Sequence, residues 1–235
     1  MKAIKHIKFQ NERKPNSHFD LLRIEELLSR KSEYDITQIH IIEFYHLLII
    51  TEGQGYHTID FTDYHYQKGA ILTIRKDQIH KFFKSTGVKG YLLLFTEDFI
   101  SSHFSKLEAL KSKQLFNELL SQPKIELNNS DYHDVLILIK QIELEYGVSN
   151  DEFSNGIIRS ALHILIIKLF RIKAKRKNFF VRKKYLTEFI AFQKLVEQHC
   201  FETKKVLDYA KKMNCTAKTL NNIVRETINK SAKAM

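Results

Sequence analysis

Five histidines lie among short apolar runs in the N-terminal half of the chain and are suited to bind a ligand there. They are His40, His46, His57, His65 and His80. Imidazole nitrogens can ligate a metal ion, titrate near neutral pH or hydrogen-bond a small molecule. No two of these histidines form a His-x-His pair, which would bring two ligands to one face of a strand. We therefore expect no metal and no cofactor, although histidines of different strands can still meet inside a barrel.

A small-molecule pocket is the other chemistry that this region can support. Such sites are concave and mostly apolar, with a few polar groups that orient the ligand. The polar candidates are His40, Tyr45, Tyr56, His57 and His80. Alternation along the strands does not decide which of them face inward. Strand histidines that only satisfy hydrogen bonds are the alternative interpretation.

A different kind of site lies near the C-terminus, where residues 204–233 are typical of two short helices joined by a tight turn. Ala210 is small where the helices cross, and Asn214 suits a left-handed turn position. Thr216 is a good N-cap for the second helix, whose inner face is apolar. This order is typical of a DNA-binding helix-turn-helix, and a plain helical hairpin is the alternative.

In a helix-turn-helix, the second helix enters the major groove and its exposed residues meet base edges. The candidate DNA-binding residues of this helix are Thr216, Ala217, Lys218, Thr219, Asn221, Asn222 and Arg225. Asn pairs with adenine, Lys and Arg pair with guanine, and an Ala methyl contacts the thymine methyl. The candidates for contact with phosphates are Lys204, Lys205 and Lys230.

The distribution of charge indicates a nucleic-acid partner. The chain holds 38 Lys+Arg and 27 Asp+Glu, a net charge of +11. Residues 171–235 hold 17 Lys+Arg and 5 Asp+Glu, so the whole basic excess lies in the last quarter. Such segregation is an electrostatic footprint for phosphate, because binding releases counterions. Residues 171–184 predict a basic junction between domains or a solvated hinge.

The elements that position these residues are predicted to be strands first and helices later. Residues 36–95 alternate short β-rich runs with breaks at residues 52–55, 62–63, 68–69, 75–78 and 86–87. This spacing indicates an antiparallel barrel or jelly roll. Helices are expected over residues 98–120, 130–146, 151–177 and 185–199, and over 18–31 unless its first half is a strand. Ser130 is the expected cap and Gly147 the expected end of one of them. The predicted fold class is α+β.

The C-terminal segment resembles the first helix-turn-helix of AraC-type transcription regulators. The matching positions are Val206, Tyr209, Ala210, Thr216, Leu220, Asn229, Lys230 and Ser231, with Asn229 in place of the usual Gly. In that family a second helix-turn-helix follows across a long connecting helix. The chain stops at Met235, about where that helix begins, so we expect a regulator truncated after its first helix-turn-helix. One module covers little of a site and binds weakly.

The strand region resembles the cupin-like sensor domain of the same regulators. The matching motifs are LLIITEGQG at residues 47–55, KGAIL at 68–72, which lacks the usual Pro and Asp, QIH at 78–80 and a closing strand at 90–95. The resemblance implies a cupin-like sensor domain over residues 1–125, a helical dimerisation region over 126–177 and a partial DNA-binding domain over 178–235. It further implies a small-molecule effector, no enzymatic activity and a homodimer formed through residues 135–170. A helix sandwiched between the barrel and its neighbours is the alternative to the dimer contact.

Two other functions stay open at this stage. One is a metal-dependent cupin enzyme, and the other is a truncated regulator that acts only by dimerising with full-length copies. We expect a cytoplasmic protein without a membrane partner. The apolar run over residues 157–170 is interrupted by Arg159, His163 and Lys168 and is shorter than the roughly 20 residues of a membrane span. The isolated Cys200 and Cys215 indicate reduced thiols.

Overall fold

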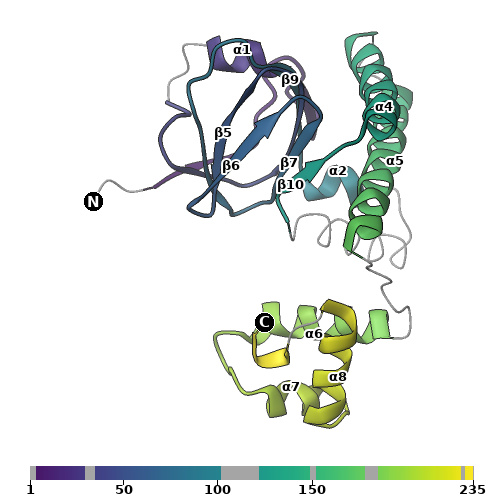
Figure 1. The fold of residues 1–235 in the computed structure, drawn as a ribbon. Coiled ribbons are helices and arrows are strands. Elements are labelled where there is room, and N and C mark those ends of the chain that lie inside the picture. Colours follow the sequence, from purple (N-terminus) through teal and green to yellow (C-terminus); the bar gives the residue numbers. More distant parts are fainter. Residues whose placement is uncertain are drawn as a thin grey trace. The chain divides into compact units, whose positions relative to one another are not determined.

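The chain folds as two compact units, Met1–Lys173 and Ala174–Met235. The computed structural model (Figure 1) describes residues 4–29, 35–101, 122–148, 152–177, 185–228 and 231–234. The first unit combines strands with helices, and the second is helical. The prediction of a mixed α+β chain is therefore confirmed. Most of the helix expected over residues 98–120 lies outside the described residues.

The described strands of the first unit form two five-stranded sheets. The strands are β1 Lys5–Ile7, β2 Phe19–Arg23, β3 His40–Ile42, β4 Tyr45–Glu52, β5 Gln54–Ile59, β6 Thr62–Gln67, β7 Ala70–Ile74, β8 Ile79–Phe82, β9 Lys89–Phe95 and β10 Lys124–Glu126. Sheet A has the order β1-β3-β8-β5-β6 and sheet B the order β10-β7-β4-β9-β2. Among the described strands only β1 and β3 pair in parallel. The first half of the segment expected as a helix over residues 18–31 is strand β2, followed by helix α1 Ile24–Ser29.

Sheet B is buried on both faces, as the side chains of strand β4 illustrate. Leu47 and Ile49 belong to one hydrophobic core with residues of the helices, while Leu48 and Ile50 belong to a second core with residues of sheet A. Successive side chains of a strand point to opposite faces, so a strand covered on both sides is apolar almost throughout. This explains the continuous run LLII, which has no polar position.

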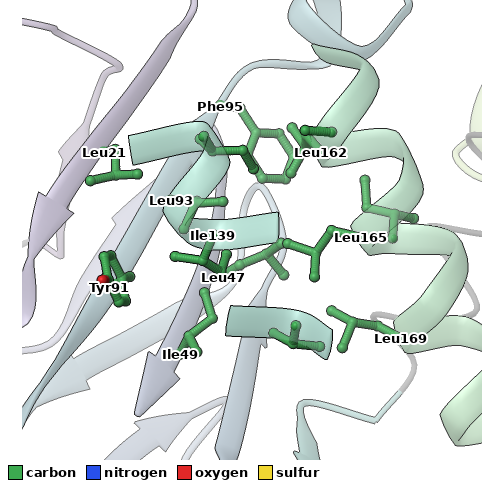
Figure 2. Close-up of a cluster of buried hydrophobic side chains, with 14 of the residues drawn as sticks. Leu21, Leu47, Ile49, Tyr91, Leu93, Phe95, Ile139, Leu162, Leu165 and Leu169 are labelled. Carbon is green, nitrogen blue, oxygen red and sulfur yellow. The ribbon is translucent and has the colours of Figure 1, made fainter. Parts of the chain in front are cut away.

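Two long helices cover the face of sheet B that is turned away from sheet A. They are α4 Asn129–Val148 and α5 Glu152–Lys177, and a short helix, α2 Glu97–Ser101, follows β9. Figure 2 shows Leu47 and Leu93 of the sheet against Ile139 of α4 and Leu165 of α5. Val135, Ile139 and Ile142 are the fully buried positions on the inner face of α4. Helix α4 and the part of α5 up to Lys173 belong to the first compact unit, whose core they share.

Three boundaries differ from their predictions. The cap of α4 is Asn128, whose side-chain oxygen accepts from the Asp131 N–H at 2.8 Å, and Gly147 lies within the helix instead of ending it. The break between β5 and β6 falls at Asp60 and Phe61, whose φ angles are +47° and +63°. Two left-handed residues in a row make the tight hairpin turn that matches strand twist, so residues 62 and 63 begin β6.

Gly53 is needed where β4 turns into β5. Its φ is +78°, and a Cβ atom there would lie 2.5 Å from the carbonyl oxygen of Gly87. Both the backbone conformation and the close approach therefore favour glycine. The predicted break over residues 52–55 is narrower in the structure, because Gln54 and Gly55 belong to β5.

Helix α5 is long and apolar enough, between Phe153 and Lys175, to meet the length and composition test for a membrane span. A core helix of a globular protein passes the same test. Leu162, Leu165 and Leu169 on this helix are buried in the core beside sheet B. One such helix is weak evidence and does not indicate a membrane protein.

In the described part of the second unit, three helices after α5 surround one small core. The helices are α6 Leu186–His199, α7 Val206–Lys212 and α8 Ala217–Ile228, followed by a 3-10 turn at Ala232–Ala234. Ala210 is fully buried beside Leu220, as the close crossing of α7 and α8 requires. Asn214 has a φ of +52°, so the predicted left-handed turn is confirmed. Leu207 is 54% exposed and does not take part in the inner face of α7.

The two leucines of α7 and α8 give a matched test of this core. Leu220→Ala removes a fully buried side chain, and we expect it to lower the free energy of unfolding by about 2–5 kcal/mol. Leu207→Ala, at an exposed site, should change it by about 0.5 kcal/mol or less. Urea unfolding of the full chain, followed by circular dichroism, measures both. Equal losses for the two variants would contradict the assigned core.

Candidate functional sites

Four histidines come together between the two sheets. His40 of β3, His46 of β4, His57 of β5 and His80 of β8 are all 5% exposed or less. The His80 ring is central, with ring centroids 4.2 Å from His40, 5.2 Å from His46 and 5.3 Å from His57. We call these residues the histidine cluster.

Strand alternation and register create this cluster. His40 and His80 are direct partners across β3 and β8, and His80 is opposite Ile59 of β5. His46 precedes Leu47, so it lies on the face of β4 that is turned toward sheet A. Each histidine thus occupies an inward position of its own strand, in the same layer as the apolar core between the sheets.

The hydrogen bonds within the cluster leave several ring nitrogens without a partner. His57 Nε2 and His80 Nδ1 lie 3.2 Å apart and share a hydrogen bond. His40 Nδ1 lies 2.9 Å from the Gln38 carbonyl oxygen, so this nitrogen carries the hydrogen and donates it. Among the described residues, both ring nitrogens of His46, Nδ1 of His57 and Nε2 of His80 are buried without a partner. Such atoms are costly unless a ligand or water binds them.

The surroundings keep these imidazoles neutral. Burial lowers the pKa of His57 to about 3, with a smaller effect from His40. Burial and repulsion from the other histidines hold the pKa values of His46 and His80 well below the usual value. Burial also lowers the pKa of His40, although its hydrogen bond to the Gln38 carbonyl acts in the opposite direction. At neutral pH the cluster therefore offers uncharged donors and acceptors.

The structure brings three of the five predicted ligand-binding residues together and separates the other two. His40, His57 and His80 are in the cluster. Tyr45 lies on the opposite face of β4, where it stacks on Phe95 at 5.7 Å within the core beside the helices. Tyr56 is 51% exposed and contacts His65 on the outer side of sheet A, because it alternates with His57. His46 joins the site instead. Because β4 is buried on both faces, alternation along the strand does not by itself show which of its side chains face sheet A.

Two further observations concern metal binding and pockets in the first unit. Within the described ranges, no group of three or more His, Cys, Asp or Glu side chains is arranged to hold a metal ion. An open pocket of about 560 Å³ lies away from the histidine cluster. It is lined by Gly53, Gln54, Gln67, Lys68, Gly69, Leu127, Asn129 and Tyr132.

Helix α8 exposes one polar face in the second unit. Its exposed residues are Lys218, Thr219, Asn222, Arg225 and Glu226. Thr216, just before the helix, accepts a hydrogen bond from the Thr219 N–H at 3.1 Å, so the predicted cap is confirmed. Positions 218, 222 and 225 are spaced by four and three residues and therefore share one side of the helix.

Asn221 and Ala217 face the interior of the second unit instead. The Asn221 side chain donates to the Ala217 carbonyl oxygen at 3.0 Å and accepts from the Ala232 N–H at 3.0 Å. Both ends of its amide are therefore engaged, and it connects α8 to the C-terminal turn. Ala217 is partly buried and packs against the core of the unit.

The predicted phosphate contacts lie before α7 and after α8. Lys204 and Lys205 are both exposed just before α7. Lys230 lies outside the described residues. Thr203, next to this pair, donates its hydroxyl to Asp208 at 2.6 Å, which fixes the start of α7.

The first unit has the architecture of a cupin-like domain: two facing sheets, rich in antiparallel pairs, with helices on the outer side of one of them. The family model for the AraC-like ligand binding domain matches residues 25–165, more than half of the chain. The chain therefore belongs to the AraC-like ligand-binding domain family, whose members sense ligands in regulators.

Solved structures give more distant likenesses. The AraC-like transcriptional activator CuxR is 9% identical, with a TM-score of 0.39, over 78% of this chain and 61% of CuxR, so the chain spans about three fifths of that protein. Apo ToxT from Vibrio cholerae is 9% identical, with a TM-score of 0.37, over 93% of this chain and 97% of ToxT. TM-scores below 0.5 do not establish a common overall fold. No curated protein matches the sequence significantly.

The adjacent asparagines of α8 provide a matched prediction. Asn221→Ala leaves the buried Ala232 N–H without its acceptor, and we expect the unfolding free energy to fall by about 1–3 kcal/mol. Asn222→Ala, at an exposed site, should change it by about 0.5 kcal/mol or less. Urea unfolding of both variants measures the difference. Comparable stability of the two would show that the Asn221 hydrogen bonds do not support the unit.

Proposed function

We propose that this chain is a DNA-binding transcription regulator of the AraC type. In this proposal the two-sheet domain senses a small molecule, and helix α8 enters the major groove of promoter DNA. The observation that carries the proposal is the combination, in one chain, of an AraC-like ligand-binding domain with a basic helical unit that exposes a polar helix face. A regulator of this kind is not an enzyme and works in the cytoplasm.

The DNA-reading residues in this proposal are those on the exposed face of α8. Lys218 and Arg225 pair with guanine, Asn222 pairs with adenine, and Thr219 contacts a base or a nearby phosphate. Thr216 fixes the N-terminus of the helix, where backbone N–H groups attract a phosphate. The internal hydrogen bonds of Asn221 favour a positioning role for it, and partial burial favours the same role for Ala217.

Phosphate contacts complete the proposed DNA interface. Lys204 and Lys205, exposed before α7, contribute to affinity without reading sequence, and Lys230 is assigned the same role from its position in the sequence. These contacts make binding steeply dependent on salt.

The effector site in this proposal is the histidine cluster. Its unpartnered nitrogens are hydrogen-bonding groups inside an apolar core, and they supply the polar contacts that a small-molecule ligand requires. Tyr45 belongs to the neighbouring core on the other face of β4, so a change at His46 reaches the helices through a single strand. A ligand that prefers one arrangement of β4 would thereby bias α4 and α5.

DNA binding is tested by two substitutions on α8 and one elsewhere. Arg225→Ala and Asn222→Ala should each weaken binding to the cognate site by about 1–3 kcal/mol and relax sequence preference, because each removes a base contact. Lys194→Ala, which removes an exposed positive charge from α6, should weaken binding less and leave the preference unchanged. Gel shifts at low salt, with cognate and scrambled promoter DNA, measure both effects. Equal behaviour of the three variants, or no shift by the parent chain, would overturn the proposal.

We also propose that the chain forms a homodimer through α4 and α5. Large apolar side chains remain exposed on these helices: Ile137, Leu144, Phe153, Ile157 and Ile164. They are spaced by seven residues on α4 and by four and seven on α5, which gives each helix one outward apolar stripe. A second copy presenting the same stripes would cover them.

Dimerisation is tested by placing a charge on these stripes. Leu144→Glu and Ile164→Glu should shift the sedimentation of the chain from dimer to monomer, because each buries an unpaired carboxylate in the contact. Lys76→Glu, at an exposed site in the turn between β7 and β8, is the control and should leave the dimer intact. A parent chain that sediments as a monomer at all concentrations would rule out this contact.

A further inference from the structure

We propose that the histidine cluster is an acid-responsive latch that holds strand β3 against β8, and that protonation of its imidazoles releases this edge of sheet A. The inference concerns the first unit alone and holds whether or not the chain binds DNA. It adds a second input, the proton, to a domain that the family assigns to ligand sensing.

The cluster lies at the junction where β3 joins the sheet. Only two register pairs connect β3 to β8 among the described residues, His40 with His80 and Ile41 with Ile79. Two backbone hydrogen bonds flank them, from the Phe82 N–H to the Ile36 oxygen at 3.1 Å and from the Asp77 N–H to the Ile42 oxygen at 2.8 Å. One of the two pairs therefore consists of cluster histidines, and β1 depends on the same junction because it pairs with β3.

No counter-charge in the described core stabilises a protonated cluster. The electrostatic partners of His46, His57 and His80 are other histidines of the cluster. Tyr64 and Tyr66 of β6 share the same core, and burial raises the pKa of Tyr66, so it stays neutral.

Charged residues on the strands and turns beside the cluster have other partners. Asp63 accepts from the Thr58 hydroxyl, Lys81 lies 4.6 Å from the ring centroid of Phe83, and Asp60 accepts from Gln78. Asp63, Thr58 and Lys81 alternate with the inward residues of their strands and belong to the outer side of sheet A. A proton on one imidazole is therefore repelled by a proton on any other, without a carboxylate to offset it.

The sign of the pH dependence follows from proton binding. In the closed sheet His46, His57 and His80 bind protons only well below pH 6.5, whereas in the opened edge their pKa values return to the ordinary value near 6.5. Between the pKa values of the closed form and 6.5, the opened form thus binds more protons than the closed form. The closed form is therefore favoured above pH 6.5, and its population decreases as the pH falls. Each histidine released contributes about a tenfold shift toward the opened form per pH unit.

Hydrogen exchange of the full chain tests the latch directly. The Phe82 and Asp77 amides bond across the junction, so their protection factors report its opening. Between about pH 7 and pH 5.5, with a chelator present, we expect their protection to fall at least about tenfold. Amides of the β4–β9 ladder, away from the junction, should lose much less protection.

Two histidine variants distinguish protonation of the cluster from a general destabilisation of the chain by acid. His46→Leu removes one titrating ring that has no hydrogen bond and lies 5.2 Å from the His80 ring at the junction. It should make the protection of these amides less dependent on pH, by up to about tenfold per pH unit. His65→Gln, at an exposed histidine on the outer side of β6, should leave it unchanged. If His46→Leu fails to fold, His57→Gln supplies the same comparison.

Three outcomes would overturn the proposal. The first is constant protection of both amides across this range of pH, and the second is the same slope for the cluster variants and for His65→Gln. The third is stoichiometric binding of zinc chloride at neutral pH that raises protection in the parent chain and is lost in His46→Leu. That result would assign the cluster to a metal ion instead of protons.

Discussion

Burial of sheet B on both faces is the constraint on which the rest of the first unit depends. Strand β4 is covered by the helices on one side and by sheet A on the other. Successive side chains of β4 therefore pack alternately into the core beside the helices and into the core between the sheets. Leu47 thus contacts the helices while His46 lies among the histidines. A single strand therefore connects the candidate effector site to the helices proposed as the dimer contact, without any intervening loop.

The sequence predicted the order of the elements better than the composition of the site. The strands over residues 36–95 and the turn at Asn214 could be predicted, because periodicity and turn chemistry are local. Which side chains meet could not, because that depends on register between distant strands: Tyr45 and His46 are neighbours in sequence but lie in different cores. The same limit applies to the Asp60–Phe61 turn, where Phe61 is an uncommon residue in a left-handed conformation.

In the second unit the helices followed from local patterns, whereas the roles of adjacent residues did not. Asn221 and Asn222 are indistinguishable by residue type, yet one bonds to Ala217 and Ala232 and the other is exposed. The difference is set by the turn at Ala232–Ala234, which packs back on α8 from beyond its end. The polar face left exposed is that of Lys218, Asn222 and Arg225, and the proposed regulator reads DNA with it.

The measurement that tests this account most directly is an NMR titration of the full chain with promoter DNA, which follows the amide signals of the second unit. The account predicts that shifts concentrate at Lys218, Asn222 and Arg225 and at the lysines before α7, while Asn221 keeps the hydrogen bonds that hold the C-terminal turn. Two results would contradict it: signal shifts confined to α6, and α8 signals that do not change when DNA is added.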